Sequence, residues 1–236
     1  MWRCCALWQR TLLNKWNGRE FAAKHGCPVP ELYWQGGLFS RPPLESLPDN
    51  FVVRPVWGAF QRGVLLISDG VELLRQESAT LPELRRTLSL PRRLSHPTRI
   101  LIEELVTSSD RRFPLECKCH CFGDAVAAVQ VIERVGFRKA THRFYTPEWE
   151  PFPDRMNVFL DEAEIRDPPG CLESILGHAA RVGAALGTYM RIDFFVADRG
   201  CVFSELSSVP LAGRDFTPYC DELFGALWAE KVPAAT

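Results

Sequence analysis

Apolar residues recur along the chain in two periods, one typical of strands and one of helices. Short β-rich runs predict strands at 32–34, 51–55, 63–67, 99–106, 115–122, 125–132 and 142–145. Apolar positions at helical spacing predict helices over 11–25, 171–186 and 215–228, and helical material broken at Pro82 over 70–90. Proline and glycine interrupt 26–50, and 146–170 is proline-rich, so we expect loops there.

The segment 191–207 predicts a β-hairpin on which the functional interpretation depends. Two β-rich runs flank Asp198-Arg199-Gly200, a three-residue loop with glycine in the last, left-handed position. This loop sets the register of the two strands. It places the following pairs opposite each other on one side of the sheet: Ala197 and Cys201, Phe195 and Phe203, Asp193 and Glu205, and Arg191 and Ser207.

The predicted pairing of Asp193 with Glu205 needs a physical explanation. Two carboxylates directly opposite each other destabilise a sheet unless positive charge lies between them. Mg²⁺ is the natural candidate, because it is a hard cation that one or two carboxylates hold together with substrate phosphates. The alternative is an exposed hairpin whose acidic side chains face water.

Composition limits the class of protein. The chain has 236 residues, enough for one large domain or two small lobes, and a net charge of −1. A chain with this net charge lacks the overall positive charge typical of proteins that bind nucleic acid or anionic membranes, so we expect neither as a partner. The N-terminal residues lack the apolar run of a signal peptide, and no stretch has ~18 uninterrupted apolar residues. We therefore expect a cytoplasmic protein without membrane insertion.

Nine cysteines, an odd number, form no disulfide-like framework and favour a reducing compartment. Three of them, Cys117, Cys119 and Cys121, invite a zinc interpretation, but on a strand they alternate onto one face about 6.6–6.8 Å apart at Cα. That spacing would strain ligation of one zinc ion by all three. The other interpretation turns the cysteines to the core, and Lys118 and His120 together to the opposite face.

Several motifs, taken together, resemble the TupA-like family of the ATP-grasp superfamily. The hairpin pattern Arg-x-Asp-Phe-Phe, a short turn, then x-x-Phe-x-Glu resembles the superfamily's metal-binding hairpin. Single motifs are weak, and their order along nearly the whole chain, from about 14 to 228, carries the resemblance. The other matching segments are Asn14-Lys15 with Arg19-Glu20, 47–54, 100–104, 118–123, 142–149 and 203–206.

The resemblance implies an α+β ATP-grasp fold with two lobes whose antiparallel sheets clamp MgATP. It divides the chain into a reduced N-terminal segment of one helix and loops (1–48), a small lobe (49–105) and a large lobe (106–236). The large lobe then carries the metal-binding hairpin and the C-terminal helix. Little precedes Asn14, so the lobe that often binds the acceptor substrate is expected to be reduced.

The resemblance also implies an activity and a set of site residues. ATP-grasp enzymes typically form an acylphosphate from a carboxylate, which an amine then attacks to give an amide. Phosphoryl transfer is catalysed mainly by positioning and charge neutralisation, so we assign no nucleophile and no general base. The implied cofactors are ATP and Mg²⁺. The implied roles are as follows: Arg191, Lys118 and Arg134 act on the transferred group; Arg54 and Lys118 bind the ATP phosphates; Glu103, Glu104 and Leu105 form the adenine-binding hinge; Asp193, Glu205 and Ser207 bind metal.

Three positions depart from the family pattern. Arg54 replaces the usual Lys, the phosphate-covering loop 56–62 has Gly58 as its only glycine, and Ser207 replaces an amide or Thr. The first functional interpretation is a ligase for a small-molecule or peptide carboxylate and an amine, in cell-envelope polysaccharide or peptide-conjugate biosynthesis. The second is a catalytically impaired nucleotide-binding or scaffold subunit, and the third a metal protein that uses the Cys/His cluster. A homo-oligomer is compatible with all three.

Overall fold

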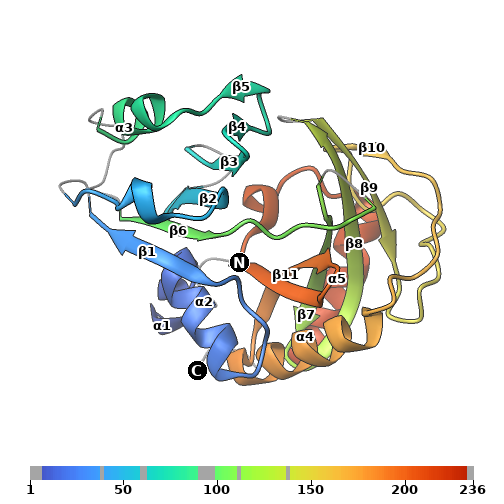
Figure 1. Ribbon diagram of the computed structural model, residues 1–236. Helices are drawn as coiled ribbons and strands as arrows, with labels where there is room; N and C mark the ends of the chain where they lie inside the picture. Colours follow the sequence, from blue (N-terminus) through green and yellow to red (C-terminus); the bar gives the residue numbers. More distant parts are fainter. Residues whose placement is uncertain are drawn as a thin grey trace. The chain divides into compact units, whose positions relative to one another are not determined.

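A computed structural model describes residues 7–37, 40–58, 63–89, 99–110, 113–136 and 139–232. The chain forms two compact units. The larger unit comprises Met1–Val29, Thr107–Val135 and Ala140–Thr236, and the smaller unit comprises Pro30–Val106 with Gly136–Lys139. Each unit is built around its own six-stranded sheet (Figure 1).

The sheet of the smaller unit has the order β1-β6-β2-β3-β4-β5, and every neighbouring pair is antiparallel. Its core contains apolar residues of β2, β3 and β6, including Phe51, Val53, Ile67 and Ile102. The predicted strand pair at 51–55 and 63–67 is confirmed, and part of its connecting loop lies outside the described residues. The elements are β1 (Leu32–Gly36), η1 (Leu44–Ser46), β2 (Asn50–Pro55), β3 (Leu65–Ser68), β4 (Val71–Glu72), β5 (Glu77–Ser78), α3 (Leu81–Ser89) and β6 (Ile100–Glu104).

The prediction of helical material broken at Pro82 was wrong for 70–80. Two short strands, β4 and β5, occupy that segment and form the edge of the sheet. Helix α3 begins at Leu81, so Pro82 lies in its first turn, where the missing N–H has no partner within the helix to lose. Proline therefore marks the start of this helix instead of interrupting it.

The sheet of the larger unit has the order β10-β9-β8-β7-β11-β12. β7 pairs antiparallel with both β8 and β11, while β10 runs parallel to β9. The elements of this unit are α1 (Leu7–Thr11), α2 (Lys15–Lys24), β7 (Leu115–Phe122), β8 (Ala125–Gly136), β9 (Lys139–Tyr145), β10 (Asp161–Glu162), α4 (Leu172–Leu186), β11 (Tyr189–Ala197), β12 (Gly200–Ser207), η2 (Pro210–Gly213) and α5 (Pro218–Lys231).

Helix α4 packs one apolar side against a face of this sheet. Ile175, Ala179, Val182 and Leu186 recur at helical spacing and are all buried, as the sequence predicts. Gly183 lies on the same side, and a Cβ built there would overlap the carbonyl oxygen of Gly123 in the β7–β8 turn. The helix therefore approaches the sheet at a distance that only glycine permits.

The helix predicted over 11–25 corresponds to α2, which begins only at Lys15, while α1 lies before the predicted range and reaches it at Thr11. Residues 12–14 separate them, and Asn14 is the N-cap of α2. Its Oδ1 accepts hydrogen bonds from the backbone N–H of Trp16 (3.0 Å) and Asn17 (3.3 Å). Asparagine thus supplies the acceptor that the first turn of α2 lacks, and it starts a new helix where the apolar pattern indicated a continuous one.

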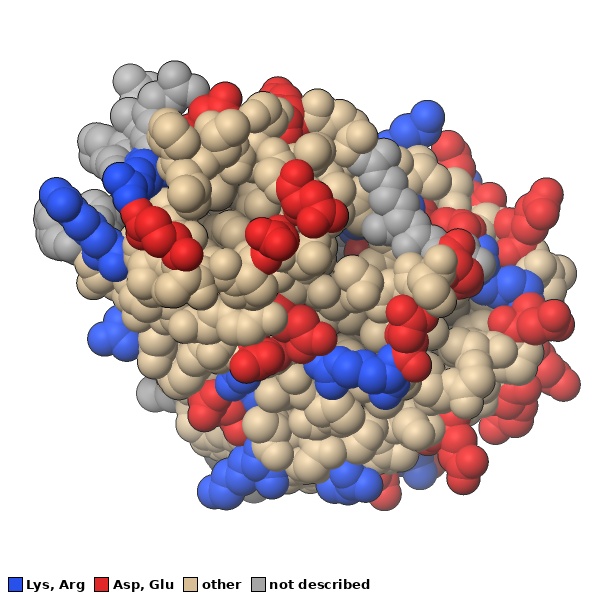
Figure 2. Space-filling view, viewed as in Figure 1, with Lys and Arg blue, Asp and Glu red and all other residues tan. Residues whose placement is uncertain are grey.

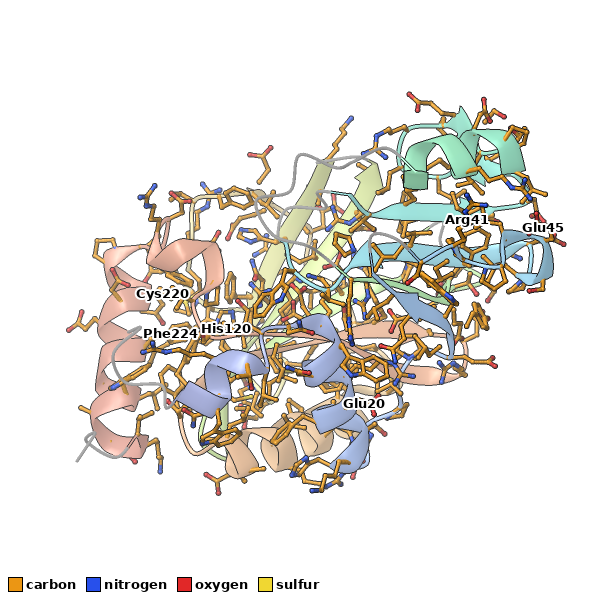
Figure 3. All side chains as sticks on the ribbon, turned by 90° about the vertical axis from the view of Figure 1, so that its left-hand side faces the viewer. Glu20, Arg41, Glu45, His120, Cys220 and Phe224 are labelled. Carbon is orange, nitrogen blue, oxygen red and sulfur yellow. The ribbon has the colours of Figure 1, made fainter. Side chains whose placement is uncertain are left out.

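The opposite face of the sheet carries an aromatic cluster that α5 covers. His120 of β7 is buried there, with its ring centroid 5.1 Å from Phe224 of α5 and 5.6 Å from Phe144 (Figure 3). Its Nδ1 is hydrogen-bonded to the Tyr189 hydroxyl at 2.8 Å. Burial and the nearby Arg191 charge lower the pKa of His120 to about 3, so its imidazole is neutral in the folded protein.

Candidate functional site

The hairpin predicted at 191–207 is formed by β11 and β12 of the larger unit. Arg191 pairs with Ser207 and Asp193 pairs with Glu205, as the sequence predicts. Asp193 and Glu205 therefore lie directly opposite each other on neighbouring strands, and their side chains extend from the same face of the sheet.

Nearer the turn the predicted register was wrong by one residue. Ala197 pairs with Gly200 instead of Cys201, and the same offset applies to Phe195. The turn has two residues where the sequence predicted three. The register shift between residues 193 and 194 restores the alignment, because β12 has one extra residue there, Ser204.

Asp193 accepts three charged hydrogen bonds although it is only 1% exposed. Arg191 donates from Nε to Oδ1 and from Nη2 to Oδ2, each at 2.7 Å. Lys118 of β7, which pairs with Asp193 across the sheet, donates from Nζ to Oδ2 at 2.7 Å. This two-pronged arginine contact plus a lysine is the arrangement that stabilises a buried carboxylate.

Glu116 connects two of the predicted basic residues. The Lys118 ammonium is 2.8 Å from Glu116 Oε2, and the guanidinium of Arg134 donates from Nη2 to Glu116 Oε1 at 2.7 Å. Glu116 was not predicted as a site residue. Its position two residues before Lys118 on a strand was the available signal, because such residues share a face of the sheet.

Glu205 is also held between two cations. Arg191 Nη2 lies 3.5 Å from Glu205 Oε1, and Lys15 Nζ of helix α2 lies 3.6 Å from Oε2. Ser207 is half-buried on β12 opposite Arg191. Lys15 lies in a segment that matches the family pattern, but no role was predicted for it. The fold brings it to Glu205, which is 190 positions away in the chain.

These contacts form one series of alternating charges across the sheet, which we call the charge chain. Each of its three acidic residues contacts two basic residues, and the series contains four basic residues in all. Its members, in order, are Lys15, Glu205, Arg191, Asp193, Lys118, Glu116 and Arg134. The charge chain brings together the predicted Arg191, Lys118, Arg134, Asp193 and Glu205.

Three buried members of the charge chain, Asp193, Glu116 and Lys118, stay ionised because their neighbours carry the opposite charge. Burial opposes ionisation of Asp193, but the neighbouring Arg191 and Lys118 outweigh it and lower the pKa of this carboxyl. Glu116 follows the same balance, with Lys118 and Arg134 lowering its pKa to about 2. For Lys118, Asp193 and Glu116 outweigh burial and raise the pKa of the ammonium. Asp193, Glu116 and Lys118 are therefore charged at neutral pH.

The predicted ligands Asp193, Glu205 and Ser207 suit a hard divalent cation by their chemistry. They offer two ionised or ionisable carboxyl groups and a hydroxyl on adjacent strands, and oxygen donors of this kind hold Mg²⁺. Asp193 uses three of the roughly four acceptor positions of a carboxylate. Within the described residues no group of three or more His, Cys, Asp or Glu side chains is placed to hold a metal ion. Further ligands would thus come from phosphate or water.

Arg54 lies in the smaller unit, on β2, and is 8% exposed. Its Nε donates to Glu103 Oε2 at 2.6 Å. Two acids follow the apolar residues 100–102, which predicts that the chain leaves the core at Glu103. Glu103, on β6, is instead 1% exposed, so this prediction was wrong. The cause is this buried ion pair, which lets a carboxylate occupy an interior position of the strand.

The remaining predicted hinge residues are Glu104, which is the last residue of β6, and Leu105, which follows it. Glu104 is half-buried, and its carboxylate accepts a hydrogen bond from the Glu31 backbone N–H at 3.0 Å. The Glu104 backbone N–H donates to the Glu31 carbonyl at 2.8 Å. Leu105 follows the last residue of the strand and is half-buried. Within the smaller unit, an ion pair between the neighbouring strands β2 and β6 joins Arg54 to Glu103, and Leu105 follows Glu104 directly in the chain.

The cysteines of the zinc interpretation point into the core of the larger unit. Cys117, Cys119 and Cys121 are fully buried among apolar side chains of α4 and the sheet, and Lys118 contacts Asp193 from the other face. Burial raises the pKa of the Cys117 thiol to about 12 and that of Cys119 well above its usual value. A protonated thiol is a poor metal ligand, so this arrangement favours core packing.

Comparison with solved structures defines the class of protein. A D-alanine–D-alanine ligase from Bacillus anthracis complexed with ATP is similar over 93% of this chain and 65% of its own, with TM-score 0.58 and 14% identity. The D-cycloserine synthetase DcsG has TM-score 0.58 and 17% identity over 95% of this chain and 72% of its own. The ATP-grasp ligase PsnB, complexed with minimal precursor, Mg and ADP, has TM-score 0.53 and 15% identity over 97% and 62%. The chain has the ATP-grasp fold.

The chain belongs to the TupA-like ATP-grasp family, whose sequence model matches residues 41–229. This match confirms the predicted family and the predicted α+β fold class. No curated protein matches the chain. The chain spans 65% of the length of the Bacillus anthracis ligase, and at 14% identity the likeness shows the fold alone.

Two surface properties bear on partners. No helix in the described part of the chain is long and apolar enough to cross a membrane. On the face shown in Figure 2, the described acidic and basic side chains are interspersed, and neither sign gathers into one continuous field there. The expected absence of a nucleic-acid partner, the cytoplasmic location and the oligomeric state stay predictions.

Proposed function

We propose that the protein is a Mg²⁺- and ATP-dependent ligase that joins a carboxylate to an amine. The observation that carries this proposal is the charge chain, in which paired Asp193 and Glu205 alternate with basic residues on one sheet of an ATP-grasp fold. Phosphoryl transfer needs such an array, because its transition state spreads negative charge over several oxygens.

Each residue of the site has a proposed role. Asp193 and Glu205, with Ser207, would hold the metal ion that neutralises the triphosphate. Arg191, Lys118 and Arg134 would hold the transferred phosphoryl group and the acyl group by charge-assisted hydrogen bonds. In the smaller unit, Arg54 would contact the ATP phosphates, and Glu103, Glu104 and Leu105 would bind the adenine end. The larger unit would carry the large lobe and the smaller unit the small lobe.

The proposed reaction has two steps. A carboxylate oxygen of the first substrate attacks the γ-phosphorus of ATP, which gives an acylphosphate and ADP. The amine of the second substrate then attacks the acyl carbon, the acyl C–O bond breaks as the amide forms, and the departing phosphate takes the proton that the amine loses. Neither step requires a nucleophile or general base from this chain, because the basic residues act by stabilising negative charge.

The proposed substrates are a small-molecule or peptide carboxylate and an amine. The structurally similar proteins support this proposal, because they are a D-alanine–D-alanine ligase, a D-cycloserine synthetase and an ATP-grasp ligase complexed with its minimal precursor. The TupA-like family suggests cell-envelope polysaccharide or peptide-conjugate biosynthesis as the setting. A cytoplasmic location completes the proposal, because ATP is available there.

A second candidate is a nucleotide-binding or scaffold subunit without turnover. It is favoured by Arg54, whose Nε is held by Glu103 in a buried pair, and by Ser207, which is a weaker metal ligand than the usual amide. In this case the fold and the charge chain would bind MgATP, and no ADP would form.

One screen separates the two candidates. The protein is incubated with MgATP and pools of amino acids, uronic acids and peptides, and ADP and phosphate are measured. The ligase proposal predicts ADP release with at least one pool and its loss in Asp193→Asn at an unchanged circular dichroism spectrum. The scaffold candidate predicts a higher melting temperature with MgATP and no ADP with any pool. If no ADP is released and the melting temperature does not change, both candidates are contradicted.

A further inference from the structure

The Lys118 ammonium is shared between two carboxylates. Its Nζ lies 2.7 Å from Asp193 Oδ2 and 2.8 Å from Glu116 Oε2, and its side chain is 13% exposed. Lys118 thus neutralises a carboxylate that the proposed function assigns to the metal ion, while it also contacts a second carboxylate that has no such role.

Asp193 cannot gain a metal ion without a change in its surroundings. Arg191 and Lys118 already contact it, and a divalent ion bound to its carboxylate would lie within a few ångströms of both basic groups. Like charges at such separations repel strongly where little water intervenes. One of the two basic side chains must therefore move, or additional negative charge must arrive with the metal.

Lys118 is the basic residue that can move. Arg191 is fixed by two parallel hydrogen bonds to Asp193 and by its contact with Glu205. Lys118 ends in a single ammonium on a flexible stem, and its contact with Glu116 would remain if it left Asp193. The second contact means that this ammonium stays paired during the exchange.

We propose that Lys118 is an internal counter-cation that occupies the metal-binding carboxylate Asp193 until metal and nucleotide arrive together. Lys118 then leaves Asp193 and contacts a phosphate oxygen while Glu116 retains it. This inference rests on the proposed function of the same site, and it goes beyond it by making Glu116 a positioning residue. It also makes Lys118 a determinant of the order of binding, because metal alone competes with the lysine for Asp193.

The test measures metal binding directly, without turnover. Mn²⁺ serves as the probe, and its free concentration is read by electron paramagnetic resonance in the absence of nucleotide. We expect Lys118→Met to bind Mn²⁺ about tenfold more tightly than the wild type, the equivalent of about 1.4 kcal/mol. The same variant should bind ADP with Mg²⁺ at least about tenfold more weakly, because a phosphate contact is lost. These changes have opposite signs, which a general loss of structure would not produce.

The matched control is Lys231→Met. Lys231 lies on α5 of the same unit and pairs with the exposed Glu230, so the variant removes the same charge away from the site. It should leave both affinities unchanged. If Lys118→Met does not fold, Glu116→Gln provides the second test. Loss of the alternative partner should confine Lys118 to Asp193 and weaken Mn²⁺ binding.

Two results would overturn the inference: Mn²⁺ affinity in Lys118→Met equal to or weaker than in the wild type, or tighter Mn²⁺ binding in Glu116→Gln. Asp193→Asn distinguishes this failure from failure of the proposed function. If Asp193→Asn abolishes Mn²⁺ binding while Lys118→Met changes nothing, the metal site stands and the exchange is wrong. If Asp193→Asn also changes nothing, both the inference and the assigned metal site are wrong.

Discussion

Asp193 and Glu205 lie directly opposite each other on β11 and β12, although the turn between these strands is one residue shorter than their spacing predicts. The extra residue Ser204 on β12 corrects the alignment. A bulge of this kind changes which face of the sheet a residue occupies, because side chains alternate along a strand. The pairing of the two carboxyl groups therefore depends on a local irregularity next to the proposed metal site.

Arg191 should contribute more to stability than a half-buried arginine of the same unit. Arg191→Met removes one of the two basic side chains that contact the buried Asp193 and leaves the Lys118 contact, and breaking such a buried pair typically costs about 3–5 kcal/mol. The matched control is Arg143→Met, which removes a half-buried side chain that lies 3.8 Å from Glu162 and donates from Nε to the Ala163 carbonyl at 2.6 Å; its loss should cost about 1–2 kcal/mol. Urea unfolding measures both. Equal losses for the two variants would contradict the role given to Arg191.

Gly183 and Gly177 provide a matched pair within α4. Gly183→Ala should destabilise the protein by about 1–3 kcal/mol, because the new Cβ overlaps the carbonyl oxygen of Gly123. Gly177→Ala meets no atom within 4 Å and should stabilise the protein, by about 0.5–1 kcal/mol, through helix propensity. Thermal unfolding of both variants checks this. A neutral Gly183→Ala would show that α4 does not pack this closely on the β7–β8 turn.

His120 should make stability fall as the pH falls below the ordinary histidine range. Its pKa is lowered to about 3 in the folded protein, against about 6.5 in an unfolded chain. Between these values the unfolded state binds the additional proton, so unfolding becomes easier by about 1.4 kcal/mol per pH unit from this group. The loss begins near pH 6.5 and ends near pH 3, below which both states are protonated.

Substitution isolates this contribution. His120→Leu should reduce the slope of unfolding free energy against pH by about one proton between pH 6 and 4. Urea unfolding at several pH values provides the slopes. An unchanged slope in His120→Leu would mean that this imidazole is not buried in its neutral form.

Much of the larger unit follows from local sequence pattern. The helix at 171–186 has a regular apolar stripe and glycines at both ends, and α4 occupies Leu172–Leu186. The alternation of Cys117, Lys118 and Cys119 predicted which face each side chain occupies, and the cysteines are in the core. In both cases the spacing of apolar residues within one element determines which side of that element is buried, and contacts with distant parts of the chain are not needed to predict it.

Other features depend on contacts that local pattern does not contain. Glu103 appeared to be an emergence point because acids are rarely buried, and its partner Arg54 comes from a different strand. Lys15 reaches Glu205 only because α2 packs beside β12. Asn14 is a different case, because asparagine is a common helix N-cap and the sequence alone could have indicated a helix start there. The prediction followed the apolar stripe across this position instead.

The central claim is that Asp193 takes part in binding a metal–nucleotide complex. The most direct test is isothermal titration calorimetry of ATP binding, first with excess Mg²⁺ and then with the metal chelated. The proteins compared are the wild type, Asp193→Asn and the control Asp161→Asn, which lies on the edge strand β10. We predict that chelation weakens ATP binding at least about tenfold in the wild type and in Asp161→Asn. Asp193→Asn with Mg²⁺ should bind as weakly as the chelated wild type. Equal affinity in all three proteins, with and without Mg²⁺, would contradict the account.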